Sequence, residues 1–200
     1  MLRRAVVVSL CTVIAVSVFQ TITALAPTGT DIAAPVVAPS SVTSDTAVSQ
    51  AGLVANLRPV RLVIPSIQLD ATIEARGLDA GRNLDTASDF EHVAWYDRGP
   101  APGQPGNALI NGHVNWWTGD AAFTRLKQVR IGDRVQVVRA DGTSVLFTVS
   151  ARQTVPANAR VASLFAPSRS ASLTLITCAG VWNPLAMSDT QRLLVSASLA

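Results

Sequence analysis

Residues 134–151 read RVQVVRADGTSVLFTVSA, and the fold class follows from this stretch. Apolar residues stand at every second position before Asp141-Gly142 and again after it, at Val145 and Phe147. Apolar alternation on both sides of Asp-Gly is the strongest short-range signal for a β-hairpin. We therefore expect two antiparallel strands joined by a tight turn.

Short β-branched runs broken by Gly, Pro, Asp and Asn continue on both sides of this hairpin. Residues 98–106 (RGPAPGQPG) are rich in proline and glycine and are predicted to form a loop. The good helix candidates are short, at 120–126 and 159–165. The remaining strand candidates are 60–64, 71–74, 107–111, 173–177 and 193–198. So many short strands predict an all-β domain, either a closed barrel or a sandwich, because closure removes exposed strand edges.

The first third of the chain does not read as part of this domain. Residues 5–26 carry no charge and follow two arginines, and about 20 apolar residues in a helix cross a hydrocarbon core. We therefore expect residues 1–26 to be a single-pass membrane anchor with a cytoplasmic N-terminus. A cleaved signal peptide is the alternative, since Ala-Leu-Ala at 24–26 fits a signal peptidase site.

Residues 27–58 contain three prolines and many small residues but no aromatic side chain. This composition is typical of a disordered linker. It would lift a domain formed by residues 59–200 off the cytoplasmic membrane. The predicted location is therefore the cell membrane, with residues 59–200 extracytoplasmic.

Composition excludes several classes of function. Hydrophobic residues make up 48% of the chain and charged residues 14%, so the chain has enough apolar residues to form a globular domain and is not a disordered protein. Sixteen scattered basic residues are offset by thirteen acidic ones, and no nucleic-acid partner is expected. Two cysteines and two histidines disfavour a disulfide scaffold and a metal centre, and the glycines form no phosphate-binding pattern. We predict neither a cofactor nor a metal.

Cys178 is the strongest candidate for chemistry. It ends an apolar run and is followed by Ala179-Gly180, which places the thiol at the rim of the sheet. Cys11 lies in the predicted anchor and is out of reach, and an unpaired thiol in an exported domain is a liability unless it is buried or used. A small buried hydrophobe is the plain alternative.

Two further residues complete a set that suits acyl transfer. His113 follows the 107–111 strand, and Arg192 opens the last strand. A thiolate can attack an acyl group, an imidazole can donate and accept the proton, and a guanidinium can contact substrate or an oxyanion. His92 lies in an acidic loop and is interpreted as an ordinary residue.

Residues 173–178 (LTLITC) resemble the T-L-x-T-C strand of the sortases, the membrane-anchored cysteine transpeptidases of bacterial surfaces. The order of His113, Cys178 and Arg192 also resembles that family, and so does the LVIP sequence at 62–65. The resemblance covers roughly residues 60–200. Class F and class E sortases are the most similar, class F more closely.

The resemblance implies a closed eight-stranded sortase-like β-barrel with one or two short helices and no calcium site. It implies that Cys178 cleaves the Thr–Gly bond of a Leu-Pro-x-Thr-Gly-like sorting signal through a thioester. His113 would be the acid and base, Arg192 the substrate or oxyanion contact, and Thr177 a substrate-binding residue. The implied partners are sorting-signal peptides of surface proteins and an amine acceptor on the cell wall or a pilin.

Two alternatives stay open. An L,D-transpeptidase would carry Gly before its cysteine and Arg two residues after it, where this chain has Thr177 and Gly180. A non-catalytic, membrane-tethered β-domain that binds cell wall or a surface protein would keep its function in Cys178→Ala. Within the sortase interpretation, hydrolysis could replace transpeptidation.

Overall fold

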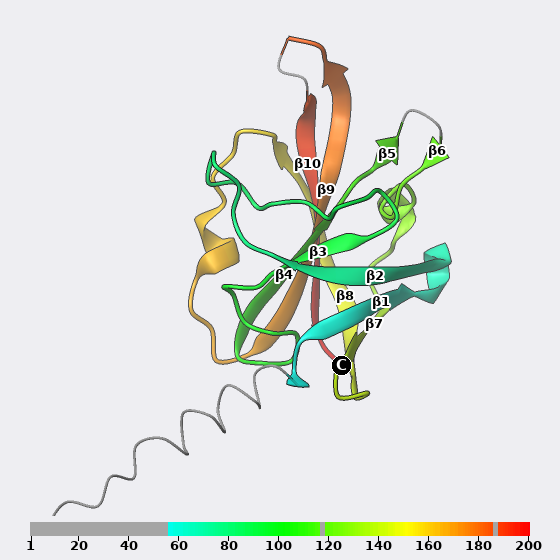
Figure 1. Cartoon of the computed structure of the whole chain (residues 1–200), viewed down its shortest axis with the longest axis vertical. Coiled ribbons are helices and arrows are strands. Elements are labelled where there is room, and N and C mark those ends of the chain that lie inside the picture. The colour runs from blue at the N-terminus through cyan, green and yellow to red at the C-terminus, as the bar shows by residue number, and fades with distance from the viewer. Residues whose placement is uncertain (1–55, 117–118, 186–187) are drawn as a thin grey trace, which may run out of the picture. The chain divides into compact units, whose positions relative to one another are not determined.

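The computed structural model describes residues 56–116, 119–185 and 188–200 (Figure 1). The predicted anchor at 1–26 and nearly all of the predicted linker at 27–58 lie outside the described residues. Within the described part of the chain, no helix combines the length and hydropathy needed to span a bilayer.

Eight strands close into a barrel in the order β1-β2-β3-β4-β9-β10-β8-β7. The β2–β3 and β4–β9 pairs are parallel, and the other neighbours are antiparallel. The barrel strands are β1 (Pro59–Ile64), β2 (Leu69–Arg76), β3 (Val93–Tyr96), β4 (Gly106–Gly112), β7 (Arg134–Arg139), β8 (Ser144–Pro156), β9 (Ala171–Asn183) and β10 (Ser188–Leu199). The closed eight-stranded barrel confirms the predicted fold. A separate two-stranded pair joins β5 (Asn115–Trp116) to β6 (Gly119–Asp120).

The β7–β8 hairpin forms as its alternation predicts. Val137 pairs with Val145, and the inward-facing residues of both strands are buried. The carboxylate of Asp141 accepts a hydrogen bond from the backbone N–H of Thr143 at 2.8 Å. Gly142 follows with φ of 81°, a left-handed conformation that glycine adopts without steric cost.

The strands divide the apolar residues between two sides of the barrel wall. The interior is filled by alternate residues of every barrel strand, including Leu62, Ile110, Phe147, Leu173, Leu175 and Val195. A smaller cluster, called here the outer cluster, consists of Leu109, Val155, Ile176 and Leu194. Val161 and Leu164, in the connection between β8 and β9, pack against it. β9 and β10 are therefore apolar on both faces, because both faces are covered.

The predicted ends of β9 and β10 are wrong. β9 continues past Cys178 to Asn183, and β10 begins at Ser188, before Arg192. β4 ends beside Thr177, and β8 ends opposite Gln191 of β10. Beyond both ends β9 and β10 pair only with each other and extend from the barrel as a ribbon (Figure 1). The thiol thus lies within a strand, at the level where its neighbour on one side ends.

Local signals misled the prediction at two other places. Neither predicted helix forms. The segment predicted at 120–126 begins in β6, and only its last residue belongs to the 3₁₀ turn η2 (Leu126–Gln128). The segment predicted at 159–165 contains only the 3₁₀ turn η3 (Ala162–Phe165), and a third turn, η1 (Pro65–Ile67), joins β1 to β2. Short segments of this kind contain too few intrahelical hydrogen bonds to offset helix nucleation. The four-residue strand β3 is missing from the predicted strands, because its sequence, VAWY, shows no alternation of apolar and polar residues.

Candidate active site

The β9–β10 pairing brings two of the three predicted catalytic residues side by side. Arg192 is the direct antiparallel partner of Cys178. Successive side chains of a strand point to opposite faces, so Cys178 shares the outer face with Ile176, and Arg192 shares it with Leu194. The thiol and the guanidinium therefore belong to the outside of the barrel, next to the outer cluster.

The β4–β9 pairing brings the third predicted catalytic residue, His113, toward the other two. These parallel strands stay in register up to the residue before Gly112. The hydroxyl of Thr177 then donates a hydrogen bond of 2.7 Å to the carbonyl of Gly112. The next residues along the two strands are His113 and Cys178, which are consequently level with each other. The fold thus brings together, on β9, on β10 and just beyond the end of β4, residues that are far apart in the sequence.

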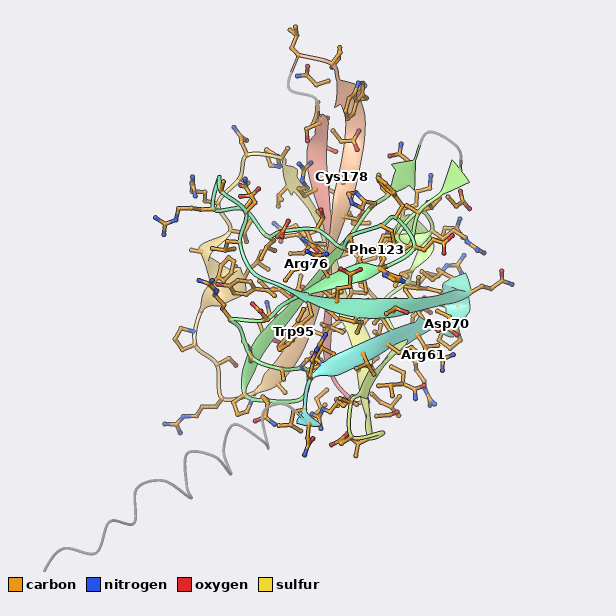
Figure 2. All side chains as sticks on the ribbon, viewed as in Figure 1. Arg61, Asp70, Arg76, Trp95, Phe123 and Cys178 are labelled. Carbon is orange, nitrogen blue, oxygen red and sulfur yellow. The ribbon has the colours of Figure 1, made fainter. Side chains whose placement is uncertain are left out.

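Partial burial dominates the electrostatics of Cys178, which lies on β9 (Figure 2). It raises the pKa of the thiol, because burial disfavours the charged thiolate. The positive charge of Arg192 acts in the opposite direction and lowers this pKa, whereas the negative charge of Asp189 raises it. The thiol is protonated at neutral pH in this arrangement.

The guanidinium of Arg192 is held at the start of β10. Nη1 donates to the carbonyls of Asp189 (3.1 Å) and Gln191 (2.8 Å), and Nη2 donates to Oγ of Ser188 (2.9 Å). A guanidinium has five N–H donors in a fixed fork. These contacts fix its direction and place a permanent charge beside the thiol.

Gly112 and Thr177 form the support beneath this site. A Cβ added to Gly112 would lie 2.9 Å from Cδ2 of Phe123 and 3.0 Å from Cγ1 of Val93, so only glycine fits. Thr177 is 3% exposed, and its hydroxyl is engaged by the Gly112 carbonyl. The structure thus places Thr177 inside, next to the nucleophile position, and its predicted contact with substrate stays a prediction.

His113 lies directly after β4 and is half-buried. Its backbone carbonyl accepts a hydrogen bond from the N–H of Phe123 at 2.9 Å. The ring of Phe90 packs against the imidazole, with ring centroids 4.5 Å apart and an interplanar angle of 40°. Burial lowers the pKa of His113, so the neutral imidazole is favoured.

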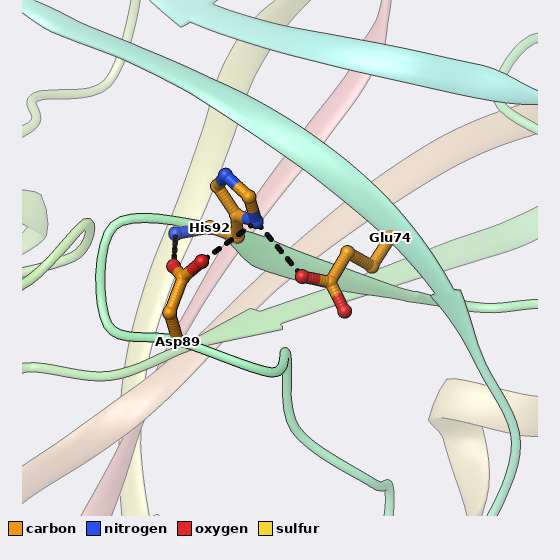
Figure 3. A group of neighbouring side chains, drawn as sticks. All are labelled: Glu74, Asp89 and His92. Atoms are coloured by element: carbon orange, nitrogen blue, oxygen red, sulfur yellow. Dashed lines mark hydrogen bonds and ion pairs between the residues drawn. The ribbon is translucent and has the colours of Figure 1, made fainter.

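One group of possible metal ligands occurs among the described residues, and it is formed by Glu74, Asp89 and His92 (Figure 3). Nδ1 of His92 lies 2.8 Å from Oε1 of Glu74 and 3.0 Å from Oδ2 of Asp89. Glu74 also accepts hydrogen bonds from Ser88 and Arg76, and these bonds with that of His92 lower its pKa to about 2, Ser88 contributing most. The protein's own donors therefore saturate this carboxylate.

The interpretation of His92 as an ordinary loop residue is incomplete, because the histidine bridges two carboxylates. Glu74 lies on β2, and the sequence between it and His92 shows no pattern that links them. The one local signal is the spacing of Asp89 and His92, three residues apart within an acidic turn.

Comparison with known proteins agrees with the fold. A sortase domain model matches residues 62–200. Sortase C-1 from Actinomyces oris is 25% identical, with a TM-score of 0.58 over 76% of this chain and 81% of that one. Sortase C1 of Streptococcus agalactiae, in complex with MTSET, is 22% identical, with a TM-score of 0.56 over 72% and 69% of the two chains. A lid mutant of sortase A from Corynebacterium diphtheriae is 23% identical, with a TM-score of 0.55 over 71% of this chain and 69% of that one. No curated protein matches the chain.

Proposed function

The chain belongs to the sortase family, and from that premise we propose that it is a cysteine transpeptidase that cleaves a sorting signal and joins it to an amine. The observation that supports this proposal is the strand register, which pairs Cys178 on β9 with Arg192 on β10 and brings the end of β4, just before His113, beside Thr177. A nucleophile, a proton carrier and a fixed cation within one short strip are what acyl transfer through a thioester needs.

In the first half of the reaction the thiolate of Cys178 attacks the carbonyl carbon of the threonine in the signal. The C–S bond forms, and the bond from that carbon to the glycine nitrogen breaks. The imidazolium of His113 donates its proton to the leaving amine, which departs as the neutral glycine end. Arg192 stabilises the negative oxygen of the tetrahedral intermediate with its charge and N–H donors.

In the second half an amine of the acceptor attacks the thioester carbonyl. The neutral imidazole of His113 accepts a proton from this amine. An amide bond forms as the C–S bond breaks, and the thiolate of Cys178 leaves. The sum of the two halves exchanges one amide for another, and no oxidant or further reactant is consumed.

The two pKa directions describe the resting enzyme. Burial raises the pKa of Cys178 and lowers that of His113, so the neutral thiol and neutral imidazole predominate near pH 7. The thiolate–imidazolium pair that starts the reaction is a minor population. Because both groups exchange protons in the proposed reaction, the pH–rate profile should depend on both of them.

A signal of the Leu-Pro-x-Thr-Gly type is proposed from the sequence resemblance over residues 60–200. Ile176 and Leu194 lie one alternation along the outer face from Cys178 and Arg192, and both are buried. They stabilise the two strands that carry the thiol and the guanidinium and offer no open surface to the peptide. Thr177 supports the nucleophile from the inside, and its predicted substrate contact would be through the backbone of β9.

The cellular setting belongs to the same proposal. Residues 1–26 would anchor the protein in the cytoplasmic membrane as a single pass, and the linker at 27–58 would hold the barrel outside the cell. Its partners would then be surface proteins with sorting signals and an amine on the cell wall or a pilin. The class F assignment is also a proposal, which rests on the sequence resemblance over residues 60–200.

Mass spectrometry of the full-length protein with a panel of Leu-Pro-x-Thr-Gly-like peptides and a simple amine tests this function. We expect a peptide–amine product and a thioester adduct on Cys178 in the wild type, and neither in Cys178→Ala. A cleaved peptide without amine product would establish hydrolysis instead. Failure of every peptide to react, together with a thiol inert to alkylation, would favour the non-catalytic binding domain.

A further inference from the structure

The aromatic ring that packs on His113 comes from a loop outside the three strands of the site. Phe90 lies in the connection between β2 and β3, and its ring centroid is 4.5 Å from that of the imidazole. The β3–β4 pairing sets Val93 opposite Gly112, so the residues before Val93 run directly beside His113. The position of this loop therefore decides what covers one side of the imidazole.

Two consecutive backbone amides tie the loop and the histidine to one segment. The N–H of Ala122 donates to the carbonyl of Phe90 at 2.7 Å, and the N–H of Phe123 donates to the carbonyl of His113 at 2.9 Å. This segment is itself fixed, because Thr124 accepts a hydrogen bond from the N–H of Ala121 at 2.8 Å. The backbones of Phe90 and His113 are thus both hydrogen-bonded to the same segment, at Ala122 and Phe123.

The side chains on both sides of Phe90 are held by a single carboxylate. Glu74 accepts hydrogen bonds from the N–H of Ser88 at 3.1 Å and from its hydroxyl at 2.5 Å. It also contacts Nδ1 of His92 at 2.8 Å. Asp89 closes the turn between them, accepting from the N–H of His92 at 2.8 Å (Figure 3). The loop is consequently clamped to β2 two residues before Phe90 and two residues after it.

We propose that Glu74 is a positioning residue, which clamps Ser88 and His92 so that Phe90 stays on the imidazole of His113. The ring limits the rotation of the imidazole and keeps water from that side of it. Both effects hold the histidine in the orientation needed for proton transfer with Cys178. This inference rests on the proposed function for its consequence in catalysis, but not for its effect on His113 itself.

The test compares Glu74→Gln and Phe90→Leu with a matched control. Glu74→Gln keeps the shape of the side chain and removes its charge. Phe90→Leu keeps an apolar cover and removes the ring current. Asp70→Asn makes the same kind of change on the same strand, at an exposed carboxylate paired with Arg61 and not with the loop.

The principal measurement needs no substrate. The chain contains two histidines, so NMR of the full-length protein labelled at histidine gives two sets of ring signals, which a His92→Gln variant assigns. We expect Phe90→Leu and Glu74→Gln to shift the His113 ring signals in the same direction, and Asp70→Asn to leave them unchanged. Unchanged His113 signals in a folded Glu74→Gln protein would overturn the proposal.

Kinetics with a reactive peptide supply the second readout. We expect Glu74→Gln to lower kcat about tenfold with KM within about twofold, since misplacement of a catalytic group costs mostly the chemical step. An equal loss in Asp70→Asn would mean a general structural effect and would overturn the proposal. If wild type transfers no peptide, the proposed function fails, while the NMR comparison still decides the clamp.

A variant that does not fold is detected by its circular dichroism. In that case Ser88→Ala removes the hydroxyl side of the clamp alone and leaves the carboxylate with its other donors. We expect the His113 ring signals to move in the same direction as in Phe90→Leu, by a smaller amount. Unmoved signals in Ser88→Ala would then contradict the proposal.

Discussion

The two long hairpins of the barrel, β7–β8 and β9–β10, are both antiparallel, but they differ in where their apolar side chains lie and in how far the strands extend. In β7–β8 the apolar residues alternate with polar ones and point inward. In β9–β10 the barrel portion is apolar on both faces, and the pairing then runs past the barrel into a ribbon. Cys178 and Arg192 lie where the one portion passes into the other.

The difference shows how a barrel separates stability from chemistry. The apolar side chains of the β7–β8 hairpin pack mainly into the barrel core. The β9–β10 ribbon instead exposes apolar residues beyond the thiol, with Val181 exposed to 74%, Trp182 to 54% and Leu185 to 97%. At this transition Cys178 and Arg192 are held by strand pairing and remain partly exposed.

The largest expected effect lies in the structural hairpin. Phe147 of β8 is fully buried, and Phe147→Ala should lower the free energy of unfolding by about 3–5 kcal/mol, because it leaves a cavity in the core. Urea denaturation measures this loss. Leu146→Ala on the same strand, at a 45% exposed position, should cost far less. Equal losses would mean that the inner and outer faces of β8 are not distinct.

The next largest effect is expected in the β9–β10 hairpin. Arg192→Lys should lower kcat/KM about 100-fold, since loss of one oxyanion donor costs about that much and lysine lacks the fixed fork. The melting temperature should stay near that of the wild type. Arg134→Lys, at an exposed position of β7, is the matched control and should keep full activity. Retained activity in Arg192→Lys would show that charge alone suffices.

The pH dependence of thiol alkylation sharpens the same contrast. Because burial raises the pKa of Cys178, its reaction with iodoacetamide should be slow at pH 7 and accelerate through the alkaline range. Arg192→Gln should move this profile to higher pH, since the charge of Arg192 lowers the pKa, and Asp189→Asn should move it to lower pH. Asp141→Asn in the β7–β8 turn should have no effect. Shifts of equal sign in the two β10 variants would refute the electrostatic assignment.

The smallest effect is expected at the tip of the ribbon. Leu185→Ser replaces an almost fully exposed side chain and should change the free energy of unfolding by less than about 0.5 kcal/mol. Urea denaturation of Leu185→Ser and Phe147→Ala in parallel compares the losses in free energy of unfolding at the two hairpins. A large loss in Leu185→Ser would mean that the ribbon is packed against something in solution.

Features decided by local pattern were predictable. Alternation around Asp141-Gly142 predicts the β7–β8 hairpin, and the proline- and glycine-rich segment at 98–106 predicts the connection between β3 and β4, which ends where β4 begins at Gly106. The extension of β9 to Asn183 was not predictable, because Gly180 looks like a strand end. In the structure Gly180 has a φ of 87°, and a Cβ there would lie 2.5 Å from Oγ1 of Thr190, so the glycine permits the ribbon to continue.

The same distinction between local pattern and tertiary structure applies to the candidate site. Cys178, His113 and Arg192 could be picked out singly, from residue type and position in the sequence. Their common level depends on the parallel β4–β9 pairing, whose partners are 65 residues apart at each step, as in Asn107 with Ser172. The contact of Phe90 with His113 and the clamp at Glu74 could not be foreseen, because they join loops and strands with no shared local pattern.

The sequence by itself thus determined the all-β class and the turn chemistry and supplied the candidate reactive groups, since these depend on residues close together in the chain. Only the tertiary structure decided the strand order, the burial that raises the pKa of Cys178 and lowers that of His113, and the ring that covers the histidine. The physical reason is that burial and register arise from surfaces brought together by closure of the barrel. Neither exists until the distant strands have met.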